Sequence, residues 1–295
     1  VISIHEPVEE FDSTVSLHVL PYRPPVGYVT AARAVRELLG HLKPNVVNAH
    51  YATGYGTLAR LVGFKPLLLS VWGSDVYDFP RISPIHRYLL VSNLRAASAI
   101  ASTSHAMAKV THQYWKPEKT YITPFGVDET LFSPATDSSL KTRDVITVGT
   151  VKTLSPKYGI DILLEAFSIL RTMLQREKPD IAQRLRLLIV GGGPQETQLK
   201  KMASELGISE QTEFRGRIPH SLVPQSLREL DIYVALSVRD SESFGVAIVE
   251  ASACGLPVVV SDADGPREVV VDGKTGFVVP KKDPNAAAAA LRRLV

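Results

Sequence analysis

The chain has 295 residues, of which 45% are hydrophobic and 21% charged, a composition that excludes a disordered protein and suits two globular domains. No apolar run reaches the roughly 18 residues needed to span a bilayer, and the first ten residues lack the basic and then apolar order of a signal peptide. The single cysteine, Cys254, excludes a disulfide framework and fits a reducing compartment, so we expect a cytoplasmic protein.

The net charge of +3 is unevenly distributed. Residues 1–143 carry 14 basic and 11 acidic side chains, and four of those acids precede residue 20, whereas residues 144–295 carry 19 of each. A basic surface on the first half suits peripheral contact with an anionic membrane, such as the inner face of a cell membrane. An ordinary solvated surface is the alternative. We do not expect a nucleic-acid partner.

Short apolar segments alternate with segments of helical period along the whole chain. In the helical segment after residue 159, for example, Ile160, Leu163, Leu164 and Phe167 fall at i, i+3, i+4 and i+7. Regular alternation of strand and helix predicts parallel sheets covered on both faces. We expect strands at 15–21, 44–50, 65–71, 97–103 and 119–124 in the first half, and at 145–151, 186–191, 231–236, 257–261 and 276–280 in the second.

A polar stretch with two prolines, residues 124–144, separates the two series of strands. We therefore expect a domain boundary near residue 140, with domains at 1–140 and 141–295. Both domains are predicted to be α/β, Rossmann-like and doubly wound, facing a cleft. Ligands of such sheets bind beyond the carboxyl ends of the strands, so residues that follow strands are the candidates for chemistry.

In the first half, polar and aromatic residues follow two neighbouring strands. His50 ends one strand, and the sequence WGSD, which contains Trp72 and Asp75, ends the next. We expect His50, Trp72 and Asp75 to face the same cleft. A purely structural role is the alternative for the histidine.

In the second half, Lys152 and Lys157 lie five residues apart on a loop after a strand, with Pro156 and Gly159 shaping the turn. Two ammonium groups at a strand end can neutralise a diphosphate. Two solvated lysines are the alternative.

The sequence VGGGPQE, at 190–196, fails as a dinucleotide fingerprint because Glu196 stands where the last glycine is required. We interpret Gly191 and Gly192 as part of a strand-to-helix turn that leaves room for a base or ribose.

The sequence SESFGVAIVEASACGLPVV, from 241, places Glu242 before a helix and Glu250 inside it. A helix start offers free N–H groups and a positive dipole end, which suit a phosphate, and Gly245 allows a close approach. Glu242 can accept hydrogen bonds from hydroxyl groups, and Glu250 can accept those of a ribose diol. The alternative is a helix-terminal charge and a partly exposed helix face.

Asp262 and Asp264 form an Asp-x-Asp pair that could hold a divalent cation on a nucleotide. Because a pattern of three residues is common by chance, we interpret it as a polar turn and expect neither a metal ion nor another cofactor.

In their order, these segments resemble the retaining nucleotide-sugar glycosyltransferases of the GT-B fold, family 4 (group 1). The resemblance lies in the E-x7-E motif from Glu242 to Glu250, and in the segments ITPFGVDETLF, VGTVKTLSPKYGIDILLEAF and LLIVGGGPQETQLKKMASELG. It covers about residues 40–291 and is most specific over 145–280.

The resemblance implies roles for individual residues in binding a nucleotide-diphosphate sugar. Lys157 matches the family's diphosphate lysine, and Lys152 stands where an arginine is usual. Glu242 matches the residue that contacts the donor sugar, and Glu250 the ribose-binding glutamate. Phe244 and Gly245 match the backbone cradle of the phosphates, with Ser243 and Val246 beside them, and Arg217 and Ile218 fall where the base packs.

Two departures from the family pattern stand out. Trp72 occupies the position where the family commonly has a histidine near the donor sugar. The family's opening strand and its closing helices have no counterpart, so we expect a chain truncated at both ends, with an incomplete first domain that exposes an apolar sheet edge and helix face.

The sequence thus predicts a retaining, metal-independent glycosyltransferase (a hexosyltransferase) that moves a sugar to an acceptor hydroxyl, in glycolipid or cell-surface polysaccharide synthesis. The acceptor is not identified, and a lipid-linked one is an open possibility. Two alternatives remain: a sugar-nucleotide epimerase on the same fold and, remotely, a Rossmann dehydrogenase, which would need the fingerprint that fails at Glu196.

Overall fold

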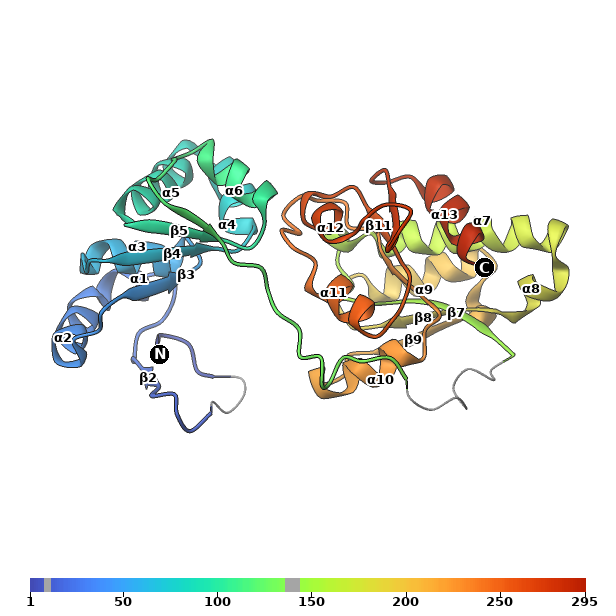
Figure 1. The fold of residues 1–295 in the computed structure, drawn as a ribbon, viewed down its shortest axis with the longest axis horizontal. Helices are drawn as coiled ribbons and strands as arrows, with labels where there is room; N and C mark the ends of the chain where they lie inside the picture. Colours follow the sequence, from blue (N-terminus) through green and yellow to red (C-terminus); the bar gives the residue numbers. More distant parts are fainter. Residues whose placement is uncertain (8–11, 136–143) are drawn as a thin grey trace. The chain divides into compact units, whose positions relative to one another are not determined.

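The structure, a computed structural model, describes residues 1–7, 12–135 and 144–295. The chain forms two compact α/β units, Val1–Pro124 and Phe125–Val295 (Figure 1). This division precedes the boundary expected near residue 140, a position outside the described residues. The reason is that the segment after Pro124 packs on the second unit: Phe132 is buried in its core, and Arg228 donates hydrogen bonds to the carbonyl oxygens of Leu131 (2.7 Å) and Ser133 (2.9 Å).

The first unit contains a four-stranded parallel sheet in the order β3-β4-β5-β6, so the described strands follow one another without a reversal. The strand expected at 15–21 is reduced to two residues, which pair with the start of the chain in a separate two-stranded sheet. The elements are β1 (Ile2–Ser3), β2 (His18–Val19), α1 (Gly27–Thr30), α2 (Ala32–Leu42), β3 (Val47–His50), α3 (Gly54–Val62), β4 (Leu67–Val71), α4 (Ser74–Tyr77), the 3-10 helix η1 (Phe79–Arg81), α5 (Pro84–Ala96), β5 (Ala99–Ser102), α6 (His105–His112) and β6 (Thr120–Ile122).

Strand β3 lies at the edge of the described sheet, and an apolar groove of about 560 Å³ runs beside it. The groove is lined by side chains of α2, α3 and β3, among them Val35, Leu39, Val47, Leu58 and Val62. Because Val35, Leu39, Leu58 and Val62 are themselves buried, the groove does not establish the exposed apolar sheet edge and helix face that we expected, which stay a prediction.

The second unit contains a six-stranded parallel sheet in the order β12-β11-β10-β7-β8-β9. The strand order reverses between β7 and β10, as it does in the doubly wound fold that the sequence predicts. The elements are β7 (Ile146–Val151), the 3-10 helix η3 (Pro156–Tyr158), α7 (Ile160–Glu177), α8 (Pro179–Arg184), β8 (Leu185–Val190), α9 (Glu196–Glu205), η4 (Ser209–Gln211), β9 (Thr212–Gly216), η5 (His220–Leu222), α10 (Val223–Arg228), β10 (Ile232–Ala235), α11 (Val246–Ala253), β11 (Val258–Ser261), α12 (Asp264–Val269), β12 (Gly276–Val279) and α13 (Pro284–Leu294).

Successive residues of these strands are buried on opposite faces of the sheet. Leu187 and Ile189 pack with α7, α9 and α13, whereas Leu188 and Val190 pack with α10 and α11. Figure 1 shows α7 and α13 on one side of the sheet and α10 on the other. Because both faces of the sheet are covered, its strands are nearly continuous runs of apolar residues. Such runs are easy to recognise as strands in a sequence.

Among the described residues, no helix is both long enough and apolar enough to cross a membrane.

Candidate functional site

The reversal of strand order places two predicted motifs next to each other. Strands β7 and β10 are neighbours and parallel, so the loop after β7 and the loop after β10 leave the sheet at the same edge. The first loop carries Lys152 and Lys157, and the second carries Ser241 to Gly245. A doubly wound sheet binds its ligands at such a point, outside the carboxyl ends of its strands.

Glu242 connects the two loops. Its side chain is buried, with 9% exposed, and one carboxylate oxygen accepts a hydrogen bond from Lys152 Nζ at 2.8 Å. Lys157 Nζ lies 3.6 Å from the other oxygen and donates to the carbonyl oxygen of Ser241 at 2.8 Å. Two cations therefore share one carboxylate, which leaves a positive charge for an anionic ligand at this edge.

Tyr158 is a member of this cluster that sequence reasoning did not identify. Its ring centroid lies 4.8 Å from Lys152 Nζ and 5.3 Å from Lys157 Nζ, so both ammonium groups contact the aromatic ring. Burial, and then the charge of Glu242, raise the pKa of the Tyr158 phenol, which stays protonated. The sequence carried one signal, the position of this tyrosine between Lys157 and Gly159.

Two of the glycines after β8 pack closely against the backbone of the loop that carries Lys152. A side chain at Gly191 would collide with the carbonyl oxygen of Lys152, and one at Gly193 with that of Leu154. The backbone of this loop thus occupies the space beside Gly191 and Gly193, and the expected place of Gly191 and Gly192 near a base or ribose stays a prediction. Lys152 N also donates to Val190 O at 2.9 Å. These glycines allow the close packing that positions Lys152, while Gly192 faces Arg217.

The backbone turns sharply into α11 at Gly245. This residue has a φ of 89°, a left-handed conformation that favours glycine, and Val246 begins the helix. Ser243 and Phe244 are buried, and the Phe244 ring packs edge-on against Phe125, with their centroids 5.7 Å apart. The buried loop holds the first N–H groups of α11 in a fixed position next to Glu242.

Glu250 lies within α11 and is only 8% exposed. One of its carboxylate oxygens lies 3.1 Å from Nε2 of His220, whose ring packs against Phe132. Sequence reasoning missed His220, because a lone histidine after RIP carries no motif. Arg217 is exposed and Ile218 packs on the core at the end of β9, the region where the base was expected, and their roles remain predictions.

Two acidic residues, one after β10 and one after β11, contact Lys281. Asp262 accepts a hydrogen bond from the backbone N–H of Lys281 at 2.9 Å, and Asp240 pairs with the Lys281 ammonium at 2.6 Å. Within the described ranges, no group of three His, Cys, Asp or Glu side chains is arranged to hold a metal ion.

In the first unit, His50 ends β3, Trp72 follows the adjacent strand β4, and their rings meet. Their rings are in an edge-to-face arrangement with centroids 5.6 Å apart, and Trp72 is 41% exposed. Burial lowers the pKa of His50, so the imidazole is neutral at physiological pH. This aromatic pair remains the candidate acceptor surface.

Asp75 is fully buried and lies beneath that surface. Its carboxylate accepts hydrogen bonds from the backbone N–H groups of Ala52 (2.7 Å), Gly73 (2.8 Å) and Trp72 (3.1 Å). Burial raises the pKa of Asp75, and these N–H donors oppose the rise. The side chain connects the loops after β3 and β4 and so positions His50 and Trp72, whereas we had expected it to face the cleft.

We expect Asp75→Ala to lower the free energy of unfolding of the first unit by about 3 kcal/mol, because three buried N–H groups lose their acceptor. Denaturant unfolding, together with hydrogen exchange of the Ala52 and Gly73 amides, measures the effect. Asp78→Ala is the matched control, since the Asp78 side chain is partly exposed. Equal stability of the two variants would contradict this role for Asp75.

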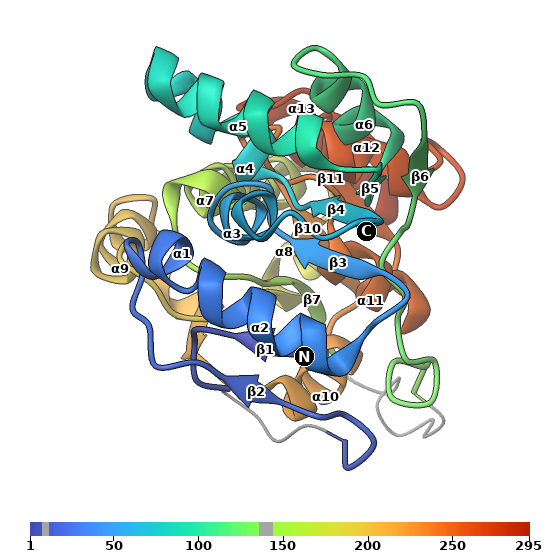
Figure 2. The ribbon, with the colours of Figure 1, turned by 90° about the vertical axis from the view of Figure 1, so that its left-hand side faces the viewer.

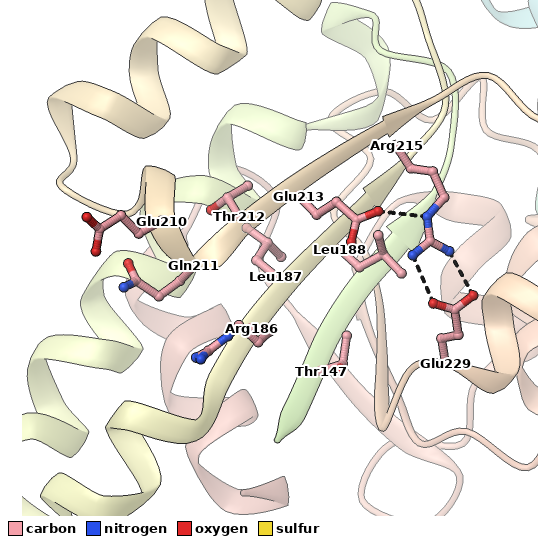
Figure 3. Close-up of a pocket in the computed structure, with 10 residues that line it drawn as sticks. All are labelled: Thr147, Arg186, Leu187, Leu188, Glu210, Gln211, Thr212, Glu213, Arg215 and Glu229. Carbon is pink, nitrogen blue, oxygen red and sulfur yellow. Dashed lines mark hydrogen bonds and ion pairs between the residues drawn. The ribbon is translucent and has the colours of Figure 1, made fainter. Parts of the chain in front are cut away.

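A pocket of about 310 Å³ lies toward the amino ends of β7, β8 and β9 (Figure 3). The guanidinium of Arg215 beside it is fully engaged: Nη1 and Nη2 each donate to Glu229 at 2.8 Å, and Nε donates to Glu213 at 2.8 Å. The hydrogen bonds to these carboxylates raise the pKa of Arg215, and the bonds to Glu229 have the larger effect. Because the cation is already neutralised, we interpret this cluster as structural.

Comparison with known proteins identifies the class. Residues 135–295 match the family described as glycosyl transferases group 1, and residues 1–104 match glycosyl transferase 4-like sequences. The chain therefore belongs to the group 1 glycosyltransferases, as its motifs predict. The dehydrogenase alternative has no support from these matches.

Two individual relatives show which kinds of glycosyltransferase this chain is similar to. The GDP-mannose-dependent α-(1-6)-phosphatidylinositol monomannoside mannosyltransferase of Mycolicibacterium smegmatis is 32% identical over 253 residues, which are 81% of this chain and 63% of that protein. One component of the phosphatidylinositol N-acetylglucosaminyltransferase of Arabidopsis thaliana is 26% identical over 95% of this chain and 62% of its own length. The chain thus spans less than two thirds of these relatives.

Solved structures confirm the predicted GT-B fold. Anabaena HepE in complex with UDP superposes with a TM-score of 0.78 at 21% identity, over 94% of this chain and 76% of that one. Sucrose-phosphate synthase from Thermosynechococcus elongatus gives 0.80 at 21% identity, over 98% and 76%.

Proposed function

We propose that the protein is a retaining glycosyltransferase that takes a sugar from a nucleotide-diphosphate donor bound to the second unit. The observation that carries the proposal is the arrangement of Lys152, Lys157 and Glu242 at the start of α11, where the strand order reverses. The site combines cations for a diphosphate, a carboxylate for sugar hydroxyls and a helix start for a phosphate.

On the donor side, each group has a distinct task. Lys152, Lys157 and the first N–H groups of α11 stabilise the negative charge that grows on the leaving diphosphate. Glu250, held by His220, accepts hydrogen bonds from the ribose hydroxyls. Glu242 already has both lysines beside it, so it positions their ammonium groups and accepts hydrogen bonds from the donor sugar.

The transfer needs no protein nucleophile. The acceptor oxygen bonds to the anomeric carbon on the face from which the nucleoside diphosphate departs, so the configuration is retained. As the bond between that carbon and the phosphate oxygen breaks, its electron pair passes to the leaving phosphate, which takes the acceptor's proton. Because lysines and a helix start supply the positive charge, the reaction requires no divalent cation.

For the acceptor, we propose a lipid-linked hydroxyl presented at a membrane surface on the cytoplasmic side. Two relatives support this choice, since their names specify phosphatidylinositol and phosphatidylinositol monomannoside. They support GDP-mannose and an N-acetylglucosamine donor equally, while HepE was solved with UDP. The uridine and guanosine donors are therefore both to be tested.

Donor screening tests the proposal. UDP- and GDP-sugars are incubated with the protein, and we expect one of them to be hydrolysed slowly, or transferred when a lipid acceptor is present, with the donor's anomeric configuration kept in the product. Product analysis by NMR separates the alternatives: an epimerised nucleotide-sugar would indicate the epimerase. Absence of thermal stabilisation by every nucleotide diphosphate would overturn the proposal.

We expect turnover in this screen to persist in excess EDTA, because the phosphate site is cationic. Loss of turnover with EDTA and its recovery with Mn²⁺ would contradict this expectation. Asp262 and Asp264 would then be the first residues to reconsider as metal ligands.

A further inference from the structure

Helix α5 of the first unit presents an exposed apolar surface. Ile85 and Tyr88, three residues apart on this helix, are 70% and 71% exposed, and Ile82 just before it is 65% exposed. Residues three apart lie on the same face of a helix, so Ile85 and Tyr88 are neighbours on the surface. Neighbouring large apolar side chains that are both exposed are unusual in a soluble domain and mark an interaction site. The rest of α5 follows the ordinary rule, with Leu90 and Leu94 buried in the core.

Aromatic and basic residues extend the surface from α5 to the segment after α6. The guanidinium of Arg95 lies 5.0 Å from the ring centroid of Trp115, and that of Arg87 lies 5.7 Å from Tyr114. Trp115 is 36% exposed. Figures 1 and 2 show α5 and α6 next to each other in both views, which agrees with these contacts.

The charge of this region is mainly positive. Residues 79–121 contain only one acidic side chain, Glu118, against six basic ones, which are Arg81, Arg87, Arg95, Lys109, Lys116 and Lys119. Two copies of the surface would therefore place like charges opposite each other, which disfavours self-association through it.

We infer that the α5 surface, defined as Arg81, Ile82, Ile85, Arg87, Tyr88, Arg95, Trp115 and Lys116, binds the interface of an anionic phospholipid bilayer. Ile82 and Ile85 enter the boundary between headgroups and acyl chains, and Tyr88 and Trp115 lie at the headgroup level, where amphipathic rings are favoured. The arginines and Lys116 contact lipid phosphates. A protein partner would require a surface of the opposite sign, and a mainly positive charge with apolar residues between fits a membrane better.

The location of the surface connects it to the candidate acceptor site. The chain passes from Trp72 and Asp75 through α4 and η1 directly to Ile82 and α5. In this respect the inference rests on the proposed function, because a membrane-bound surface close in the chain to the acceptor residues would present a lipid-linked hydroxyl to them. Binding to lipid itself is measurable without turnover, so the two proposals can fail separately.

Vesicle flotation tests the inference. The probes are vesicles of phosphatidylcholine alone and of phosphatidylcholine with phosphatidylglycerol, at low and high salt. We expect binding to the anionic vesicles that weakens with salt, and a loss of about tenfold in the partition coefficient for the double variant Ile85→Ser/Tyr88→Ser. The variant Arg81→Gln/Lys116→Gln should lose a similar factor, at low salt only.

The matched control is Val26→Ser/Val29→Ser in and before α1, which also removes two exposed apolar side chains of the first unit, 66% and 55% exposed. Thermal unfolding verifies that each variant is folded. Binding of the α5 variants at the wild-type or control level would overturn the inference. So would equal binding to the uncharged vesicles, or a dimer in sedimentation without lipid that Ile85→Ser/Tyr88→Ser abolishes.

Discussion

Glu242→Ala is expected to lower the rate of sugar transfer by about 10²–10³-fold, the usual loss when one preorganised polar contact of a transition state is removed. The match of Glu242 to the family motif is one reason to expect this loss of rate, and its contacts in the structure are a second. Glu242 holds Lys152 at 2.8 Å and Lys157 at 3.6 Å, so its removal also releases the two ammonium groups from their positions. The loss should appear in kcat, with a smaller change in the KM for the donor.

The fold should survive this substitution. The side chains of Lys152 and Lys157 are 13% and 27% exposed, so their ammonium groups can reach water when the carboxylate is gone. Thermal unfolding and nucleotide binding measure this point. Glu242→Gln, which keeps the volume and one acceptor oxygen, should lie between the wild type and Glu242→Ala in rate.

The control for this experiment is Glu205→Ala, which removes a glutamate paired with a lysine on the exposed surface of α9, Lys201 at 3.3 Å. Its rate should equal that of the wild type. A Glu242→Ala variant with near-normal turnover would refute the assigned role of Glu242.

The strands of the second unit were predictable because they are buried on both faces. Val258, Val259 and Val260 are completely buried, and a run of β-branched residues between turn signals has few other interpretations. Strand β9 was missed for the opposite reason. It lies at the sheet edge, its sequence TEFRG is largely polar, and only the pairing with β8 fixes it as a strand.

The candidate site was predictable at the level of motifs and not of contacts. The positions of Lys152 and Lys157 after one strand and of Glu242 after another could be derived, because parallel strands expose their carboxyl ends at one edge. That β7 and β10 are neighbours depends on tertiary packing, and so do the contacts of Tyr158 and His220. The packing contacts of the glycines after β8 could not be derived either, since a sequence does not show which backbone segment packs against them.

The second large effect is expected from Lys157→Met, which should lower kcat by about 10²–10³-fold because an unbranched apolar side chain cannot stabilise charge on the leaving diphosphate. Lys157 is the more exposed of the two lysines. It donates to the carbonyl oxygen of Ser241 at 2.8 Å, and the next residue is Glu242, whose carboxylate contacts both lysines. Methionine keeps most of the packing against the Tyr158 ring. The measurement is donor hydrolysis and transfer at saturating acceptor.

Lys200→Met separates this effect from the general loss of a paired lysine. Lys200 pairs with Glu196 at 2.7 Å and lies 5.8 Å from the ring centroid of Phe214, so it has the same two kinds of partner away from the strand-order reversal. We expect Lys200→Met to retain wild-type kcat, whereas Lys157→Met should also weaken binding of the nucleoside diphosphate while leaving that of the nucleoside nearly unchanged. This difference follows from the charge, since only the phosphates require the ammonium group. If both variants lost activity equally, or if Lys157→Met bound the diphosphate as tightly as the wild type, the diphosphate would have to bind elsewhere than beside Lys157.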